Sequence, residues 1–325
     1  MVAGDRAQPR WGPASPLAGG CGPPPPQPSA AASGRPAERH DHSPGGALTA
    51  VLLALAASVS WGIGDFIGGI TTRRLGVFTV LFVSQPPTLV LIAIVVIVRG
   101  GAPRPGLWMV AGVVAGLAGL VGLSAVYRGM AIGVISVVST IAATGPVVPI
   151  LVGLVLGERP TALQFFGIAL ALGGIALLAF DRRPTQSGGR LLPGVGLALV
   201  AALAFGLFLV AIRYASRPDP VWGVLATRTG SVAALLLLAV AFRSRINVAL
   251  PDLPPLFAIG VLDVGADVFF AFATTLGLLS VVSILSSLYP VATVILARIV
   301  LNERMARLQQ AGIGFAFAGV LLISI

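Results

Sequence analysis

Residues Gly133–Pro146, GVISVVSTIAATGP, return at Gly277–Pro290 as GLLSVVSILSSLYP. A shift of 144 positions brings the two stretches into register without a gap. The same shift, continued upstream, puts Trp61-Gly62 on Phe205-Gly206. Self-similarity of this length indicates an internal repeat. The chain is therefore built from two copies of one folding unit.

The composition around this repeat is strongly apolar. Hydrophobic residues make up 56% of the 325 residues, the mean hydropathy is +0.98, and only 10% of residues are charged. A soluble protein carries about 25% charged residues, so this chain cannot cover a water-facing surface. The apolar residues gather in blocks of about 20, the length at which a helix crosses a bilayer. The sequence therefore predicts an all-α polytopic membrane protein.

We predict ten transmembrane helices, arranged as two inverted five-helix repeats. Five spans are an odd number, so the second copy must enter the membrane from the opposite side, an arrangement typical of secondary transporters with a site between the halves. The expected domains are a first repeat over 47–180 and a second over 191–325. The expected spans are 47–70, 75–98, 107–129, 132–156, 161–180, 191–213, 221–242, 254–276, 278–300 and 307–325.

Residues 1–46 differ sharply from the rest, being rich in Pro, Gly, Ala and Ser. Such a segment cannot bury enough apolar surface to fold, which predicts a disordered tail. A start codon assigned too far upstream is the alternative. The single cysteine, Cys21, and the two histidines, His40 and His42, supply too few ligands for a metal site. We expect no metal and no cofactor.

The net charge of +10 comes from arginines that lie mostly at the ends of apolar blocks, where they anchor to lipid headgroups. No basic stripe with interleaved aromatic residues is present, which argues against nucleic-acid binding. The expected partners are a small-molecule substrate and the lipid bilayer. The expected location is the cell membrane, as a multi-pass protein of a bacterial inner membrane.

The repeated motif resembles the hallmark of the EamA-like transporters of the drug/metabolite transporter superfamily. The resemblance covers about residues 47–325 and implies export or exchange of small metabolites without ATP hydrolysis, with both termini cytoplasmic. Many relatives carry a basic residue in the second span, where this chain has Ser84-Gln85-Pro86-Pro87, so their substrates do not transfer to it. The motif comprises Gly133 to Pro146, Glu158-Arg159 and Gln164 to Gly167, and again Gly277 to Pro290, Glu303-Arg304 and Gln309 to Gly312.

Ionisable residues inside a bilayer are costly and indicate function by default. Asp263 and Asp267 lie in the middle of the eighth span, and their i, i+4 spacing puts both carboxylates on one helix face. Two such groups cannot both ionise easily in a low dielectric, which predicts a site for a proton or a cationic substrate. By depth, we expect Arg228 to face Asp267 and to leave Asp263 free for substrate or proton. A purely structural ion pair is the alternative.

Other polar and aromatic residues are candidates for the substrate or proton pathway. Asp65 lies late in the first span beside glycines that let another backbone approach, and it has either a functional or a structural role. Prolines in the fourth and ninth spans predict helices that bend around a central pathway. The complete set of predicted substrate- or proton-binding residues is Asp263, Asp267, Arg228, Asp65, Trp61, Ser136, Ser280 and Tyr289.

Two further features are interpreted as structural. Glu158 and Glu303 precede the fifth and tenth spans, where a carboxylate complements the helix dipole. Small residues along the third span, Gly112 and Gly116 among them, form faces for helix packing.

The sequence therefore predicts a secondary transporter that exports or exchanges a small metabolite, such as an amino acid or a similar polar or amphipathic compound, by alternating access, with or without proton coupling. A channel or scaffold is the alternative, although the charges of Asp263, Asp267 and Arg228 have no counterparts at Gly119, Leu123 and Ser84 of the first copy. A membrane enzyme is the least favoured, since no catalytic motif and no nucleotide-binding loop are present.

Overall fold

The computed structural model describes residues 44–133, 135–179, 194–242, 246, 248–301 and 307–324, and this part of the chain is helical throughout, without strands. Most of the predicted tail, up to residue 43, lies outside the described residues, as do Cys21, His40 and His42. The first repeat contains α1 (Pro44–Leu75), α2 (Val77–Arg99), α3 (Leu107–Ile132), α4 (Ile135–Ala142), α5 (Val147–Val155) and α6 (Ala162–Ala179). The second contains α7 (Val195–Ala215), α8 (Pro220–Phe242), α9 (Leu253–Leu276), α10 (Leu279–Ser286), α11 (Tyr289–Leu301) and α12 (Arg307–Ser324).

Helix falls within each of the ten predicted spans, but the fourth and ninth spans are each divided into two shorter helices. The division lies between α4 and α5 in the first repeat and between α10 and α11 in the second. Pro146 stands at the N-cap of α5, and Pro290 is the second residue of α11. Proline lacks an N–H and is tolerated in the first turn, so each proline starts a new helix. The predicted bends are breaks.

Six of the described helices, namely α1, α2, α3, α7, α8 and α9 with its preceding turn, are long and apolar enough to cross a membrane. Large apolar side chains stand exposed on their outer faces, including Val98 (81%), Val240 (78%) and Leu237 (72%). Apolar surface of this extent requires lipid around it. The chain is a multi-pass membrane protein.

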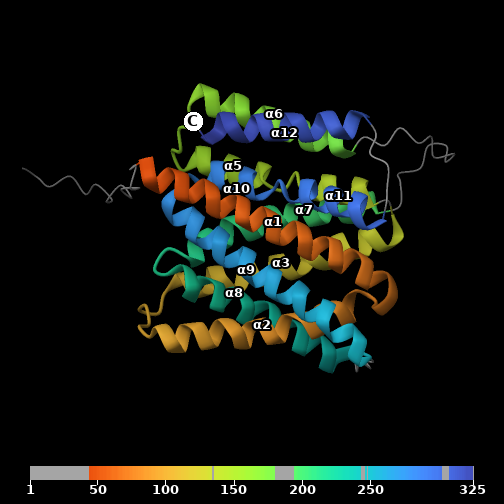
Figure 1. Cartoon of the computed structure of the whole chain (residues 1–325). Coiled ribbons are helices and arrows are strands. Elements are labelled where there is room, and N and C mark those ends of the chain that lie inside the picture. The colour runs from red at the N-terminus through yellow and green to blue at the C-terminus, as the bar shows by residue number, and fades with distance from the viewer. Residues whose placement is uncertain are drawn as a thin grey trace, which may run out of the picture. The chain divides into compact units, whose positions relative to one another are not determined.

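The most extensive helix contacts within the described residues keep their pattern when the two repeats are exchanged. α1 packs on α9, and its equivalent α7 packs on α3; α2 packs on α8, and α6 lies along α12 (Figure 1). Each of these contacts is the one expected if exchange of the two repeats leaves the arrangement unchanged. The core of the molecule is built from contacts between repeats.

Small residues allow the closest of these contacts, as predicted. A Cβ added to Gly116 of α3 would collide with the carbonyl oxygen of Thr227 in α8, and one added to Gly230 would lie 2.8 Å from the Cα of Val113. Close backbone approach of this kind is the usual means of packing helices in a membrane. It brings α3 and α8 together directly beside Arg228.

Polar contacts join the ends of the helices. Arg74 in the last turn of α1 pairs with Asp252 before α9, and Arg99 at the end of α2 pairs with Asp219 before α8 at 3.0 Å. The indole nitrogen of Trp222 donates to the carbonyl of Gly101 at 2.8 Å. The Arg74–Asp252 pair lies at the end of the bundle where α2 begins. The Arg99–Asp219 pair and the Trp222–Gly101 hydrogen bond lie at the end where α2 finishes.

Candidate functional site

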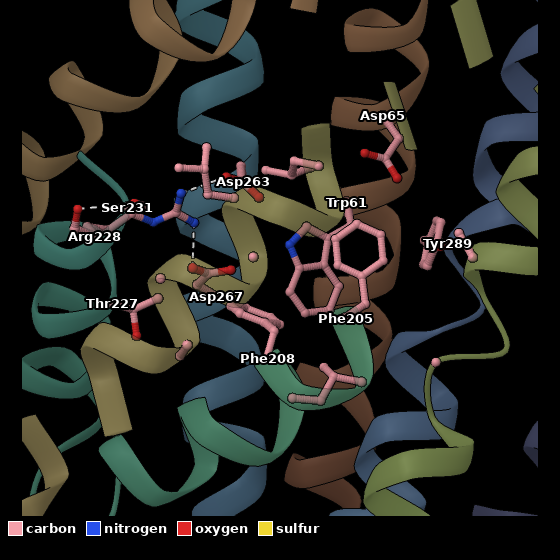
Figure 2. A pocket seen from close by; sticks show the side chains of 18 of the residues that line it. Trp61, Asp65, Phe205, Phe208, Thr227, Arg228, Ser231, Asp263, Asp267 and Tyr289 are labelled. Carbon is pink, nitrogen blue, oxygen red and sulfur yellow. Dashed lines mark hydrogen bonds and ion pairs between the residues drawn. The ribbon is translucent and has the colours of Figure 1, made fainter. Parts of the chain in front are cut away.

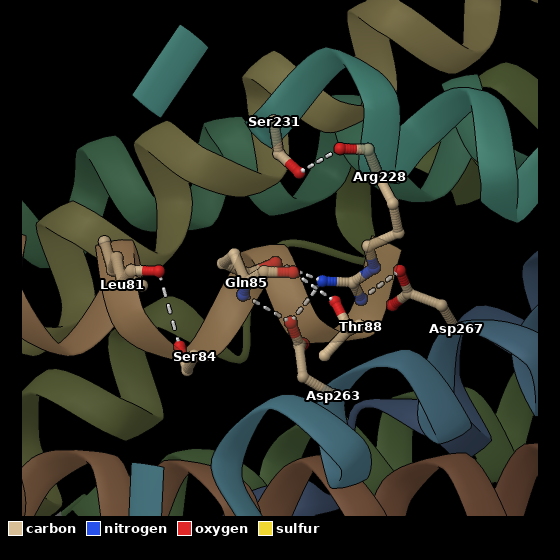
Figure 3. A network of polar contacts seen from close by, with 8 residues as sticks. All are labelled: Leu81, Ser84, Gln85, Thr88, Arg228, Ser231, Asp263 and Asp267. Carbon is tan, nitrogen blue, oxygen red and sulfur yellow. Dashed lines mark hydrogen bonds and ion pairs between the residues drawn. The ribbon is translucent and has the colours of Figure 1, made fainter. Parts of the chain in front are cut away.

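A buried charge cluster forms where α2, α8 and α9 meet (Figure 3). Arg228 of α8 is only 4% exposed. Its Nη1 donates to Oδ2 of Asp263 at 2.6 Å and to Oε1 of Gln85 at 2.5 Å, while its Nη2 donates to Asp267. Gln85 in turn donates from Nε2 to Asp263 at 2.9 Å. One guanidinium therefore holds two carboxylates and an amide in a single network.

The predicted pairing of Arg228 with Asp267 is present, but the expectation that Asp263 stays free is wrong. The two aspartates are one helical turn apart on the same face of α9, and the guanidinium presents two nitrogens in a planar fork. The fork spans one turn, so each nitrogen meets one carboxylate. The depths of Arg228 and the aspartates in the membrane, compared from the sequence, identified Asp267 as a partner. Depth alone does not reveal that one guanidinium can contact both carboxylates.

Gln85 was missed as a site residue from sequence. It lies 2% exposed in α2, immediately before Pro86 and Pro87, in an otherwise apolar span. A polar amide in such a span has to find a partner. The isolated polar amide of Gln85 in the second span could therefore have been read from the sequence as a candidate site residue.

A cavity that encloses about 740 Å³ of empty space, its mouth included, lies beside the charge cluster (Figure 2). Residues of both repeats line it, and several lining positions are equivalent under the shift of 144. In each equivalent pair one member comes from each repeat, which puts the cavity between the two copies. These pairs are Trp61 with Phe205, Asp65 with Leu209, Gly119 with Asp263, Leu123 with Asp267, and Gly145 with Tyr289.

Aromatic rings form one wall of this cavity. The ring centroid of Trp61 lies 6.1 Å from that of Phe208 and 5.8 Å from that of Phe270. Figure 2 shows the indole nitrogen of Trp61 on the side of Asp267, with Phe208 below it. The predicted site residue Trp61 thus separates the charge cluster from the α1 side of the cavity.

Asp65 and Tyr289 lie on the other side of Trp61, on α1 and α11. Both line the cavity, and both are buried, with 7% of each residue exposed. The glycine-rich turn before Asp65 does admit another backbone, as predicted: a Cβ on Gly62 would lie 2.5 Å from the carbonyl oxygen of Tyr289, and Thr293 Oγ1 donates to the carbonyl of Gly62 at 3.0 Å. This close approach joins α1 to α11 across the two repeats.

Of the predicted serines, Ser280 does not line the cavity. Its hydroxyl donates to Oε2 of Glu158 at 2.8 Å, and the same carboxylate accepts the backbone N–H groups of Leu279 at 2.9 Å and Ser280 at 3.1 Å. Glu158 therefore holds the N-terminus of α10, in the other repeat. The side chain of Ser136 and all of Glu303 lie outside the described residues.

The structural role expected of Glu158 at its own helix is wrong, because α6 starts with a different pair. The N–H of Gln164 donates to Thr161 Oγ1 at 3.2 Å, and the N–H of Thr161 donates to Gln164 Oε1 at 3.0 Å. This reciprocal capping box satisfies the first turn of α6 and leaves Glu158 for α10.

Within the described part of the chain, no group of three or more His, Cys, Asp or Glu residues is gathered as metal ligands would be. The geometry offers instead a cavity with a charged wall from α8 and α9, an aromatic wall and a separate carboxylate on α1. Such an arrangement can bind a small molecule with both apolar and charged parts.

Comparisons with known proteins agree with this architecture. The model of the EamA-like transporter family matches residues 48–180 and again 192–325. A chain described only as the crystal structure of a protein aligns with a TM-score of 0.69 at 16% identity, over 85% of this chain and 96% of its own, a likeness that shows the fold alone. No curated protein matches the chain. Since the family model covers both repeats, the chain belongs to the EamA-like transporter family of membrane transporters.

Proposed function

We propose that the chain is a secondary transporter that exports or exchanges a small polar or amphipathic metabolite through the central cavity by alternating access. The observation that carries this proposal is the cavity itself, whose lining comes from equivalent positions of the two repeats. A site between two inverted halves can face either side as the halves rock. We propose the cell membrane, the inner membrane in a bacterium, as its location.

Alternating access of this kind needs repeats of opposite orientation, and contacts between helix ends support it. Arg99 after α2 pairs with Asp219 before α8, so these two turns share one face of the membrane. α8 and α9 are each long enough to cross, which returns Leu279 to that same face. Glu158 contacts Leu279 and thus belongs to this face as well.

The number of membrane crossings between these contacts supports the view that the α4–α5 pair and α6, the shorter segments of the first repeat, each cross the membrane once. α3 crosses between Arg99 and Glu158, so the α4–α5 pair has to cross back. α7 crosses before Asp219, so α6 has to cross before it. With equivalent roles for α10–α11 and α12 in the second copy, these contacts support the proposal of ten spans in two inverted repeats.

Charge in the cavity supports the further proposal of proton coupling. Three carboxylates, those of Asp65, Asp263 and Asp267, line it together with the single guanidinium of Arg228. The excess of carboxylates can be neutralised by protons or by a cationic substrate. Arg228, Asp263 and Asp267 come from one repeat, on α8 and α9, and have no charged equivalents at Ser84, Gly119 and Leu123 of the other, which disfavours the symmetric ring of a channel.

Flux from proteoliposomes tests the transport function. Vesicles with the full chain are loaded with a mixture of small cationic, zwitterionic, neutral and anionic metabolites, and efflux is followed by mass spectrometry with and without a pH gradient. We expect selective loss of one class, accelerated by the gradient. The blocking variant is Gly119→Leu, because Gly119 lines the cavity and a Cβ there already lies 3.2 Å from the ring of Phe208.

The matched control is Gly173→Leu, at an exposed glycine of α6 where an added Cβ meets nothing within 4 Å. Flux should vanish in Gly119→Leu and persist in Gly173→Leu. Equal flux from the two variants, or no flux from the unaltered chain beyond that of empty vesicles, would reject the proposed pathway.

A further inference from the structure

The carboxylate of Asp65 forms no ion pair with the other described charged residues that line the cavity. The residue is 7% exposed, lies on α1 and faces the cavity across Trp61 from the Arg228 cluster (Figure 2). Within the described residues, no hydrogen bond or ion pair reaches its oxygens. An aspartate this deeply buried ordinarily has a partner, since an unpaired buried carboxylate is costly.

The groups around Asp65 do not provide a positive charge. Among the described titratable side chains near Asp65 are Asp263, Tyr127 and Tyr289, and none of these is a cation. Among the described residues that line the cavity, Arg228 is the one cation, and both of its terminal nitrogens are engaged by Asp263, Asp267 and Gln85. Asp65 therefore faces open space without a counterion.

The space next to Asp65 suits a cation with an apolar body. The aromatic rings of Trp61, Phe205, Phe208 and Tyr289 line the cavity that Asp65 also lines. Aromatic faces attract ammonium groups and also bury hydrocarbon. A free anion would meet carboxylates without a free guanidinium, and a zwitterion would leave its own carboxylate without a free cationic partner.

We propose that Asp65 binds the positively charged nitrogen of a small organic monocation whose apolar part lies against the aromatic wall. The proposal names the substrate class of the proposed transporter. Binding of the cation does not depend on that function, and only its movement across the membrane rests on it. A metal ion fits less well, because hard cations require several oxygen ligands and, of the described carboxylates that line the cavity, Asp65 alone lies on that side of Trp61. The Arg228 cluster then forms the wall that limits the site.

Equilibrium binding measurements separate the contribution of the ligand's charge from that of its shape. The full chain is placed in nanodiscs of neutral phosphatidylcholine, and calorimetric titration compares 2-phenylethylamine, protonated at pH 7, with its neutral isostere 2-phenylethanol and with 3-phenylpropanoate, after subtraction of empty nanodiscs. We expect the amine to bind at least tenfold more tightly than the alcohol, and the anion not to bind, since a desolvated charge pair contributes this much or more.

Variants assign the preference to one carboxylate. Asp65→Asn should lower amine affinity to that of the alcohol and leave alcohol binding unchanged, which also reports an intact cavity. Asp65→Glu should keep the preference for the amine. Asp219→Asn is the matched control, because Asp219 pairs with Arg99 outside the cavity and its replacement should alter neither ligand.

Equal affinities of the unaltered chain for amine and alcohol, or no binding of the amine, would overturn the proposal whatever the variants do. A preference for the amine that survives in Asp65→Asn would overturn it too, because the charge would then act elsewhere. Amine binding without flux would support this site and reject transport. Flux of neutral or anionic compounds without amine binding would reject the site and leave transport standing.

Discussion

Arg228 is held in an apolar span by hydrogen bonds that only a guanidinium could make together. Its two terminal nitrogens engage residues of α2 and α9, and the side chains of Arg228 and Asp267 are 5% and 2% exposed. A buried charge pair adds little net stability, but removal of one partner strands the other. The cluster therefore determines how α2, α8 and α9 fit together around the cavity.

Asp267→Asn is predicted to destabilise the protein by about 3 kcal/mol, because the positive charge of Arg228 stays buried with one carboxylate fewer. Asp263→Asn should cost less, since the Asp263 side chain is more exposed, 12% against 2% for Asp267, and Gln85 remains bonded to Arg228. Thermal unfolding in detergent measures both. The triple change Arg228→Met, Asp263→Asn and Asp267→Asn removes every charge of the Arg228 cluster and should regain most of the stability that Asp267→Asn loses. An Asp267→Asn protein as stable as the unaltered chain would contradict the argument.

Among the elements, the joint between α9 and α10 is held by opposite charges on its two sides. Arg213 at the end of α7 donates from Nη1 to the carbonyl of Thr274 at 2.7 Å, at the C-terminus of α9. Glu158 accepts from the first N–H groups of α10. A cation at a helix C-terminus and an anion at an N-terminus both oppose the local dipole favourably. The eight-residue α10 depends on these contacts because it has few turns of its own.

Glu158→Ala is predicted to destabilise the protein by about 2 kcal/mol, because three donors at the start of α10 lose their acceptor. Glu158→Gln keeps one amide oxygen and should lose about half as much. Thermal unfolding of the two variants is compared with that of Arg159→Ala, which removes an exposed neighbour. Comparable stability in Glu158→Ala and Arg159→Ala would show that α10 does not rely on this contact.

For the whole molecule, exchange of the repeats leaves the packing pattern unchanged, and the cavity lies where the two copies meet. α6 along α12 and α2 along α8 are contacts between equivalent helices, while α1 with α9 and α7 with α3 are exchanged. This pattern makes the cavity a property of the pair of repeats. Neither repeat alone could enclose it.

Labelling of single cysteines tests the orientation of the repeats. In a Cys21→Ser background, Arg73→Cys, Arg104→Cys and Arg159→Cys introduce thiols at exposed helix ends. With ten spans, a membrane-impermeant maleimide should label positions 104 and 159 from one face and position 73 from the other. Position 159 would be labelled together with 73 if the α4–α5 pair returned to its own side, and the inverted arrangement would then be wrong.

The sequence alone was sufficient for features that depend on local geometry. Composition and blocks of about 20 apolar residues predicted a helical membrane protein, and the shift of 144 between Gly133 and Gly277 predicted two repeats. The i, i+4 spacing of Asp263 and Asp267 predicted their common face, and the small residues of α3 predicted its close packing. Each of these follows from the length and period of one helix.

Contacts between helices were decided by the tertiary structure. The sequence does not contain the rotation of α2 that turns Gln85 toward Arg228, nor the position of α10 that gives Glu158 a partner in the other repeat. The lack of a counterion for Asp65 likewise depends on the helices that hold Arg228 against Asp263, Asp267 and Gln85. Rotation, depth and pairing of helices are set by the sum of many packing contacts, so a pattern along one segment cannot specify them.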